Sequence, residues 1–205
     1  MRRTLGAFAT GVTVVTTHGA AGEHGMTANS FTSVSLDPPL VLLCIRTGSR
    51  GETVIATNGV FAVNVLAADQ EALSLRFARR DRPCGHAAFH GVDHGRAATG
   101  SPILAGVAAY LDCRLTTVHS AGDHAILLGE VLAFQGDGER APLVFHGGRY
   151  STLTPAAAFA RPSSASTRRP RPFIPRTSAE RPDAASSSRA RPRPTESSPS
   201  SSIAA

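Results

Sequence analysis

The stretch GVAAYLDCRLTTVHSAGDHAILLGEVLAFQG, residues 106–136, decides the fold. Two long runs of apolar and β-branched residues, 106–120 and 124–136, are separated by the turn residues AGD. This pattern predicts two extended strands joined by a tight turn. A strand does not require a histidine at its first position, so His124 needs an explanation of its own.

Further strands are predicted on both sides of this pair. The same reasoning gives extended segments at 12–17, 26–36, 40–45, 60–66 and within APLVFHGGRY, 141–150. Asp37-Pro38-Pro39 predicts a bend, and DGE at 137–139 predicts a hairpin.

Two helices interrupt the strands. In SRGETVIATNG, 49–59, Ser49 and Glu52 form a Ser-x-x-Glu capping box and Gly59 ends the helix. The segment DQEALSLRFAR, predicted to start at Asp69, places Leu73 and Phe77 on one helical face. Six or seven mostly antiparallel strands with two short helices, and no regular βαβ alternation, indicate a mainly β protein built as a small barrel rather than a Rossmann sheet.

Charge divides the 205 residues into two parts. Residues 154–205 carry nine arginines, three acidic residues and nine of the fourteen prolines, whereas residues 1–153 carry twelve arginines and twelve acidic residues. The whole net charge of +6 therefore belongs to the tail, which has too few apolar residues to fold. We expect one domain over 1–153 and a disordered, solvated tail over 154–205. An arm that binds nucleic acid or acidic partners is disfavoured, because no aromatic residues interleave with the charges.

The cysteines and the N-terminus indicate the compartment. Cys44, Cys84 and Cys113 are odd in number and lack a C-x-x-C spacing, which favours a reducing, cytoplasmic environment. The start MRRTLGAFATGVTVVTT superficially resembles a signal peptide, but Thr10 and Gly11 interrupt its apolar run. No run approaches the roughly 20 apolar residues of a membrane span.

Two stretches offer polar groups for a ligand. The predicted helix start at Ser49, flanked by Arg46 and Arg50, would suit a phosphate, although most capping boxes bind nothing. In GMTANSFTSVS, 25–35, short hydroxyl and amide side chains could contact the edge of a heteroaromatic ring. The alternative there is an edge strand with solvated hydroxyls.

A third stretch, CGHAAFHGVDHG at 84–95, spaces its cysteine and histidines as possible ligands of one metal ion. Its candidate ligands are Cys84, His86, His90 and His94. The glycines within it argue against the helix that would align these side chains, so a solvated loop without metal is the expectation.

Several segments together carry a resemblance to a known family. They are FATGVTVVTT, GMTANSFTSVSLDPPLVLLCI, GVFAVNVLAADQEALSLRFA, GSPILAGVAAYLDCRL and AGDHAILLGEV. In this order, over residues 4–153, they resemble the flavin reductase-like domain family, the short-chain NAD(P)H:flavin oxidoreductases that supply reduced flavin to two-component monooxygenases. The resemblance implies a split β-barrel, FMN or FAD as cofactor, NADH or NADPH as hydride donor, and a homodimer with flavin near the subunit interface.

The resemblance also implies roles for single residues. The expected isoalloxazine contacts are Thr27, Ala28, Asn29 and Ser30, with Ser33 and Val34 lining the same groove. Those around the ribityl chain and phosphate are Cys44, Arg46, Ser49, Arg50 and Thr53, while Phe77 and Ala78 close the site. His124 would be the catalytic histidine that places the nicotinamide, with Tyr150 close by; the alternative is a histidine bonded only to Asp123 or to turn carbonyls.

Three departures from the family pattern accompany this resemblance. After RFA the chain reads RRDRPCGHAAF instead of an Asp-Lys-Phe-like stretch, so Arg82 is the candidate replacement for the lysine. Few residues precede Phe8 where the family has a longer helix, and the tail has no counterpart. The expected function is NAD(P)H-dependent reduction of FMN or FAD for a partner monooxygenase. The alternative is a flavin-binding electron carrier without nicotinamide turnover.

Overall fold

The computed structural model describes residues 1–153, so the expectation of a disordered tail over 154–205 lies outside the described residues. The elements, in chain order, are α1 (Arg2–Gly6), β1 (Thr10–Gly11), β2 (Thr13–Thr17), β3 (His24–Ala28), β4 (Thr32–Leu36), β5 (Pro39–Arg46), α2 (Arg50–Asn58), β6 (Val60–Val65), α3 (Glu71–Ala78), the 3₁₀ helix η1 (Gly85–Phe89), β7 (His94–Arg96), β8 (Pro102–Leu104), β9 (Ala109–Ala121), β10 (His124–Gly136), β11 (Val144–His146) and β12 (Arg149–Ser151).

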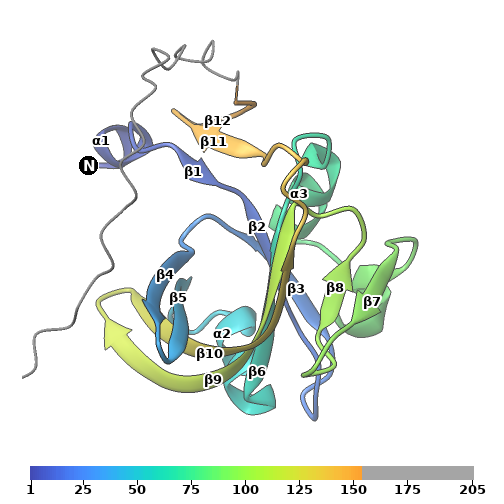
Figure 1. The fold of residues 1–205 in the computed structure, drawn as a ribbon. Helices are drawn as coiled ribbons and strands as arrows, with labels where there is room; N and C mark the ends of the chain where they lie inside the picture. The colour runs from blue at the N-terminus through green and yellow to red at the C-terminus, as the bar shows by residue number, and fades with distance from the viewer. Residues whose placement is uncertain (154–205) are drawn as a thin grey trace, which may run out of the picture. The chain divides into compact units, whose positions relative to one another are not determined.

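The centre of the molecule is a curled antiparallel sheet (Figure 1). Its seven strands follow the order β3-β2-β6-β9-β10-β5-β4, and two small sheets, β1-β11-β12 and β7-β8, accompany it. Within residues 1–153, no strand pairing joins β3 to β4, so the barrel is open between its first and last strands. The predicted split β-barrel is confirmed.

The two long strands predicted from 106–136 are β9 and β10, and they form the centre of this sheet. β10 pairs with β9 from His124 to Gly136 and with β5 from His124 to Glu130. Gly129 in the middle of β10 leaves room for a neighbour, because a Cβ there would lie 2.4 Å from the ring of Phe61 and 3.2 Å from the Cβ of Cys113. The barrel interior thus requires a residue without a side chain at this point.

Substituting Gly129 tests this packing. We expect Gly129→Ala to lower the free energy of unfolding by about 1–2 kcal/mol, because the fully buried Phe61 must shift away from the added methyl group. Urea unfolding measures the loss. Gly138→Ala is a matched control, since a Cβ there meets nothing within 4 Å. Equal stability of the two variants would contradict the tight contact.

Strand β2 is buried on both faces because it separates two hydrophobic cores. Val15 packs inside the barrel with Phe61, while Val14 packs outside it with Phe77 of α3. The threonine hydroxyls of β2 are satisfied by main-chain carbonyls, such as Thr13 Oγ1 donating to Ala28 O at 2.7 Å. This arrangement seats α3 against β2 and β3, next to the open side of the barrel.

The helix predictions hold well. Ser49 caps α2, its hydroxyl accepting from the Glu52 N–H at 3.3 Å, and Gly59 ends the helix in the left-handed conformation with φ 69°. The second helix was predicted to begin at Asp69 but begins two residues later, at Glu71, with Gln70 as its N-cap. The structure also contains α1 and η1, which were not predicted.

Three strand predictions were wrong in detail. The extended segment 26–36 is broken into β3 and β4, with residues 29–31 between them. The last strand is a short hairpin, β11 and β12, which turns at Gly147 and Gly148 with φ values of 57° and 83°. DGE at 137–139 makes a turn but no hairpin, because β10 pairs with β9 and β5 whereas β11 pairs with β1 and β12.

None of the helices within residues 1–153 has the length and apolar character that crossing a membrane requires.

Candidate functional site

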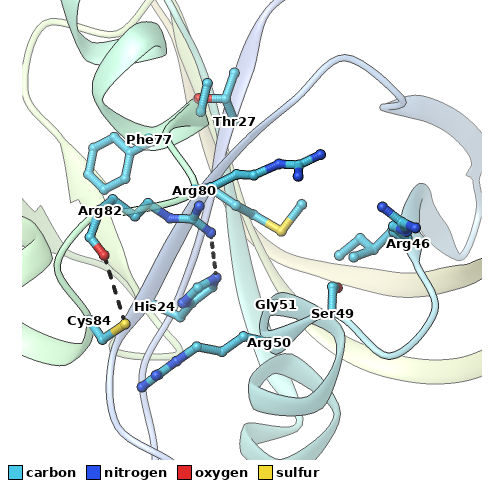
Figure 2. Close-up of a pocket in the computed structure, with 13 residues that line it drawn as sticks. His24, Thr27, Arg46, Ser49, Arg50, Gly51, Phe77, Arg80, Arg82 and Cys84 are labelled. Atoms are coloured by element: carbon cyan, nitrogen blue, oxygen red, sulfur yellow. Dashed lines mark hydrogen bonds between the residues drawn. The ribbon is translucent and has the colours of Figure 1, made fainter.

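A cavity of about 440 Å³ lies where β3, the end of β5, the start of α2 and the segment after α3 meet (Figure 2). We call it the arginine cavity. It is lined by His24, Met26, Thr27, Ile45, Arg46, Ser49, Arg50, Gly51, Phe77, Ala78, Arg80, Arg82 and Cys84.

A second cavity, of about 270 Å³, shares two of these lining residues, Thr27 and Ala78. We call it the tyrosine cavity. It is lined by Val12, Thr27, Ala28, Asn29, Ser74, Ala78, Phe145 and Tyr150. The two cavities therefore adjoin across the contact between β3 and α3, one lined by arginines and the other by neutral side chains.

The arginine cavity concentrates positive charge. Arg46, Arg50, Arg80 and Arg82 all line it, and no ion pair within residues 1–153 involves any of them. Four guanidinium groups in one cavity repel one another unless an anion lies between them. The hydroxyl of Ser49 and the N-terminus of α2 add further donors, so the cavity suits a phosphate.

His24 forms part of the floor of this cavity. Arg82 Nη2 lies 3.1 Å from His24 Nε2, and because arginine only donates, Nε2 accepts and the proton of the neutral ring is on Nδ1. Burial, together with the charges of Arg82 and Arg50, lowers the pKa of His24 to about 4. His24 is therefore neutral at pH 7.

Close packing brings the start of α2 against β3. A Cβ at Gly51 would lie 2.5 Å from Met26 Sδ and 3.4 Å from His24 Nε2. Glycine at this position lets the helix N-terminus approach the cavity wall.

The tyrosine cavity is ordered by a hydrogen-bond chain. Thr27 Oγ1 donates to the main-chain oxygen of Ser74 at 2.6 Å, and the Ser74 hydroxyl lies 2.8 Å from the Tyr150 hydroxyl. These bonds tie β3, α3 and β12 together, which fixes the Tyr150 side chain at the cavity wall.

The structure brings most of the sequence-predicted residues to the two cavities. The arginine cavity contains Thr27, Arg46, Ser49, Arg50, Phe77 and Ala78, and the tyrosine cavity contains Thr27, Ala28, Asn29, Ala78 and Tyr150. The predicted residues outside both linings are Ser30, Ser33, Val34, Cys44, Thr53 and His124.

Two of these outlying residues bond to each other. The Ser30 hydroxyl donates to Cys44 O at 2.8 Å and accepts from Cys44 N at 3.2 Å, which fastens the segment between β3 and β4 to β5. Ser33 and Val34 are exposed on β4, and Thr53 bonds to Ser49 O at 3.3 Å. Their contacts with a ligand stay a prediction.

His124 lies at the rim of the barrel, beside the arginine cavity. It stands opposite Arg46 in the pairing of β10 with β5, and side chains at directly opposite positions share a face of the sheet. Its Nδ1 lies 2.8 Å from Asp123 Oδ1, so Nδ1 donates to this carboxylate and Nε2 takes no part in the bond. This hydrogen bond and the charge of His124 lower the pKa of Asp123. This bond agrees with the alternative in which His124 is bonded only to Asp123 or to turn carbonyls, and a catalytic role of His124 stays a prediction.

The histidine cluster at 84–95 is more than a solvated loop. Its η1 turn buries Ala88 and Phe89 in the outer core. His86 Nδ1 lies 3.1 Å from the buried carboxylate of Glu23, which also receives a hydrogen bond from Arg96. Burial opposes ionisation of Glu23, but these hydrogen bonds prevail and lower its pKa. Within residues 1–153, no group of three or more potential metal ligands comes together.

Sequence reasoning did not assign several lining residues to the site. These are Val12, His24, Met26, Ile45, Gly51, Ser74, Arg80, Cys84 and Phe145. Arg82 was singled out only through the family comparison. A signal was nevertheless present, because residues 76–82 hold four arginines and one acidic residue, and two of these arginines, Arg80 and Arg82, line the cavity.

Comparison with known proteins gives a consistent result. The family model described as flavin reductase like domain matches residues 5–154. The chain is 41% identical over 154 residues to the reductase subunit HsaB of a flavin-dependent monooxygenase from Rhodococcus jostii, covering 75% of this chain and 77% of that protein. It is 47% identical over 154 residues to the FMN reductase (NADH) SmoA of Agrobacterium fabrum, covering 75% and 84%.

A solved structure is also similar. It is the NADH:FAD oxidoreductase SgcE6 of Streptomyces globisporus, with a TM-score of 0.71 and 43% identity over 75% of this chain and 92% of that one.

Proposed function

The chain belongs to the flavin reductase like domain family, and we propose that its two adjoining cavities are the flavin site of an NAD(P)H:flavin oxidoreductase. The activity is NADH-dependent reduction of FMN or FAD, and the reduced flavin passes to a partner monooxygenase. The homologues named as reductase subunits and NADH-dependent flavin reductases support this function.

The observation that carries the proposal is the pairing of a charged cavity with a neutral one. A flavin nucleotide has a flat, largely apolar ring at one end and phosphate at the other. The uncompensated arginines around Ser49 fit the phosphate. Thr27 lies on the wall shared by the two cavities, and Ala28 and Asn29 continue this wall into the tyrosine cavity, where a ring would rest. The donor set of the described residues therefore fits the cofactor that the family implies.

Bound flavin supplies the N5 atom that accepts hydride from the nicotinamide. The chain's contribution is placement, because hydride transfer needs the two rings in contact rather than a protein acid. β3 and α3 form the wall for the flavin ring, with Phe77 fixed in the outer core. In this proposal His124 orients the nicotinamide carboxamide through Nε2, while Asp123 holds its Nδ1 proton.

Steady-state oxidation of NADH with added FMN, FAD or riboflavin tests the activity. We expect turnover that requires flavin. The electron-carrier alternative predicts a single round of reduction of tightly bound flavin and no multiple turnover of added flavin.

A phosphate preference is expected from the arginine cavity. FMN should bind at least about tenfold more tightly than riboflavin, because each charge-assisted hydrogen bond to phosphate contributes about 1.5–3 kcal/mol. Fluorescence titration of both flavins gives the two dissociation constants. The preference should shrink in Ser49→Ala, because Ser49 lines the cavity and the variant lacks its hydroxyl. Equal dissociation constants of FMN and riboflavin for the wild type would show that the phosphate does not bind in this cavity.

We propose a homodimer, as the family resemblance implies. Apolar side chains on β4 and on the second half of β10 are exposed, and a second copy would cover them. The most exposed members are Val34, Leu36, Leu132 and Phe134. Sedimentation analysis of the purified protein tests this, and a monomer at working concentration would contradict it.

A cytoplasmic location is also part of the proposal. It is supported by Cys44, Cys84 and Cys113, none of which forms a disulfide within residues 1–153.

We further propose that residues 1–153 are sufficient for flavin reduction, with residues 154–205 as a separate tail. The family match at 5–154 supports this boundary. Deleting residues 154–205 should leave the unfolding midpoint and the NADH oxidation rate within about twofold of the full chain. A large loss of either quantity would show that the tail contributes to the site.

A further inference from the structure

Positive charge occupies two separate places in the arginine cavity. At the first place, Arg46 ends β5 and Ser49 caps α2; at the second, Arg82 follows α3 beside His24. Figure 2 shows Arg46 and Ser49 on one side of the pocket and Arg82, with Cys84, on the other. A single phosphate at the start of α2 therefore leaves the second place unused.

The second place is built around a fixed guanidinium. Arg82 Nε donates to Gly25 O at 2.9 Å, Nη1 donates to Arg79 O at 2.7 Å, and Nη2 donates to His24 Nε2 at 3.1 Å. A guanidinium has five N–H donors, so two remain for a ligand. All three acceptors are neutral, which orders the group in one orientation without neutralising its charge.

No carboxylate within residues 1–153 compensates this charge. Asp81, the neighbour in sequence, is bound by Arg79 through two hydrogen bonds of 3.0 and 2.7 Å. Burial lowers the pKa of Arg82, Cys84 opposes this shift, and the nearby charge of Arg50 adds to it. An anion between Arg82 and Arg50 would relieve the repulsion of the two guanidinium groups. A rigid, partly buried and uncompensated guanidinium is the kind of group that binds a phosphate oxygen.

We infer that Arg82, together with Arg50, binds the second phosphate of a dinucleotide whose first phosphate lies at Ser49 and the start of α2. The inference rests on the proposed function and extends it from one phosphate to a pyrophosphate. FMN has one phosphate and reaches one of the two places, whereas FAD reaches both. The named relatives leave this choice open, because one is an FMN reductase and another is an FAD reductase.

NADH carries the same pyrophosphate chemistry, so the experiment has an arm for each source. In the first arm, fluorescence titration gives the dissociation constants of FAD and FMN. In the second, steady-state assays give the KM for NADH with riboflavin as the hydride acceptor. Riboflavin has no phosphate, so both phosphate places stay free for NADH.

Arg82→Gln is the test variant, and Arg114→Gln is its matched control, since Arg114 is exposed on β9, pairs with Glu130 and does not line the cavity. If FAD supplies the phosphate, the wild type prefers FAD over FMN by at least about tenfold. Arg82→Gln then loses this preference, while its affinity for FMN changes less than about threefold. If NADH supplies it, Arg82→Gln raises the KM for NADH at least about tenfold and leaves the flavin constants unchanged. The control variant keeps every wild-type constant.

Arg82→Gln also removes three internal hydrogen bonds, so a measurement on the wild type alone accompanies it. ADP and AMP are compared as inhibitors of NADH-dependent riboflavin reduction, and ADP should inhibit at a concentration at least about tenfold lower. Equal inhibition by ADP and AMP, or an Arg82→Gln variant that folds and keeps all its constants, would overturn the inference. Failure of the wild type to reduce any flavin with NADH would instead overturn the proposed function.

Discussion

Replacing His124 with alanine is expected to lower kcat/KM for NADH by about ten- to a hundredfold, which corresponds to about 1.4–2.7 kcal/mol of lost positioning energy. His124 stands at the first position of β10, opposite Arg46 of the arginine cavity, with its ring held by Asp123 at 2.8 Å. Its removal should slow hydride transfer while leaving the dissociation constant of FMN nearly unchanged. Rapid mixing of NADH with the flavin-loaded variant measures that rate directly.

Two further variants separate placement from folding. His124→Asn should recover part of the rate, because an amide keeps a hydrogen-bonding group without a titratable charge. Asp123→Asn should cause a smaller loss, since it removes the partner that fixes the ring but not the ring itself. If His124→Ala transferred hydride at the wild-type rate and only its melting temperature fell, His124 would be a turn residue and its catalytic assignment would be wrong.

Acid should destabilise the protein through His24. Its pKa is about 4 in the folded chain against an ordinary value of 6.5, so the unfolded chain binds the proton more readily. The stability that comes from neutral His24 is present above pH 6.5 and is lost as the pH falls from 6.5 towards 4. The full loss is on the order of 3 kcal/mol.

Urea unfolding between pH 7.5 and pH 4 measures this loss, and His24→Gln isolates it. Glutamine keeps an acceptor for Arg82 but does not titrate, so its free energy of unfolding should fall less steeply with pH than that of the wild type. Carboxylates such as Glu23 titrate in both proteins, so their contributions to the pH dependence cancel in the comparison. Parallel curves for wild type and variant would show that His24 is not the responsible group.

Features set by local chemistry could be read from the sequence. α2 was predicted to within a residue because the Ser49–Glu52 cap and Gly59 act over single turns of chain. β9 and β10 were predicted because their runs are long and bounded by a clear turn. The hairpin at 137–139 was wrong for the opposite reason: turn residues show where the chain bends, but not which strand it pairs with afterwards.

In the candidate site, too, local features could be predicted from the sequence and long-range contacts could not. Ser49 was identified from its helix cap and flanking arginines, Thr27 and Phe77 were identified through the family motifs, and all three line the arginine cavity. His24 was missed because its contact with Arg82 joins residues that lie 58 positions apart in sequence. Ser30 and Cys44 were expected to face the ligand, yet their polar groups bond to each other, a pairing that requires β3 and β5 to be placed first.

The strand order has a consequence for synthesis of the chain on the ribosome. Every residue of the arginine cavity lies between His24 and Cys84, but β5 is paired with β10 and β6 with β9. The sheet that supports the cavity is therefore incomplete until β10, which ends at Gly136, has emerged. A nascent chain that stops before β9 would carry all the cavity's residues and still lack the strands that hold its walls in place, so the flavin site can form only after β10 has emerged.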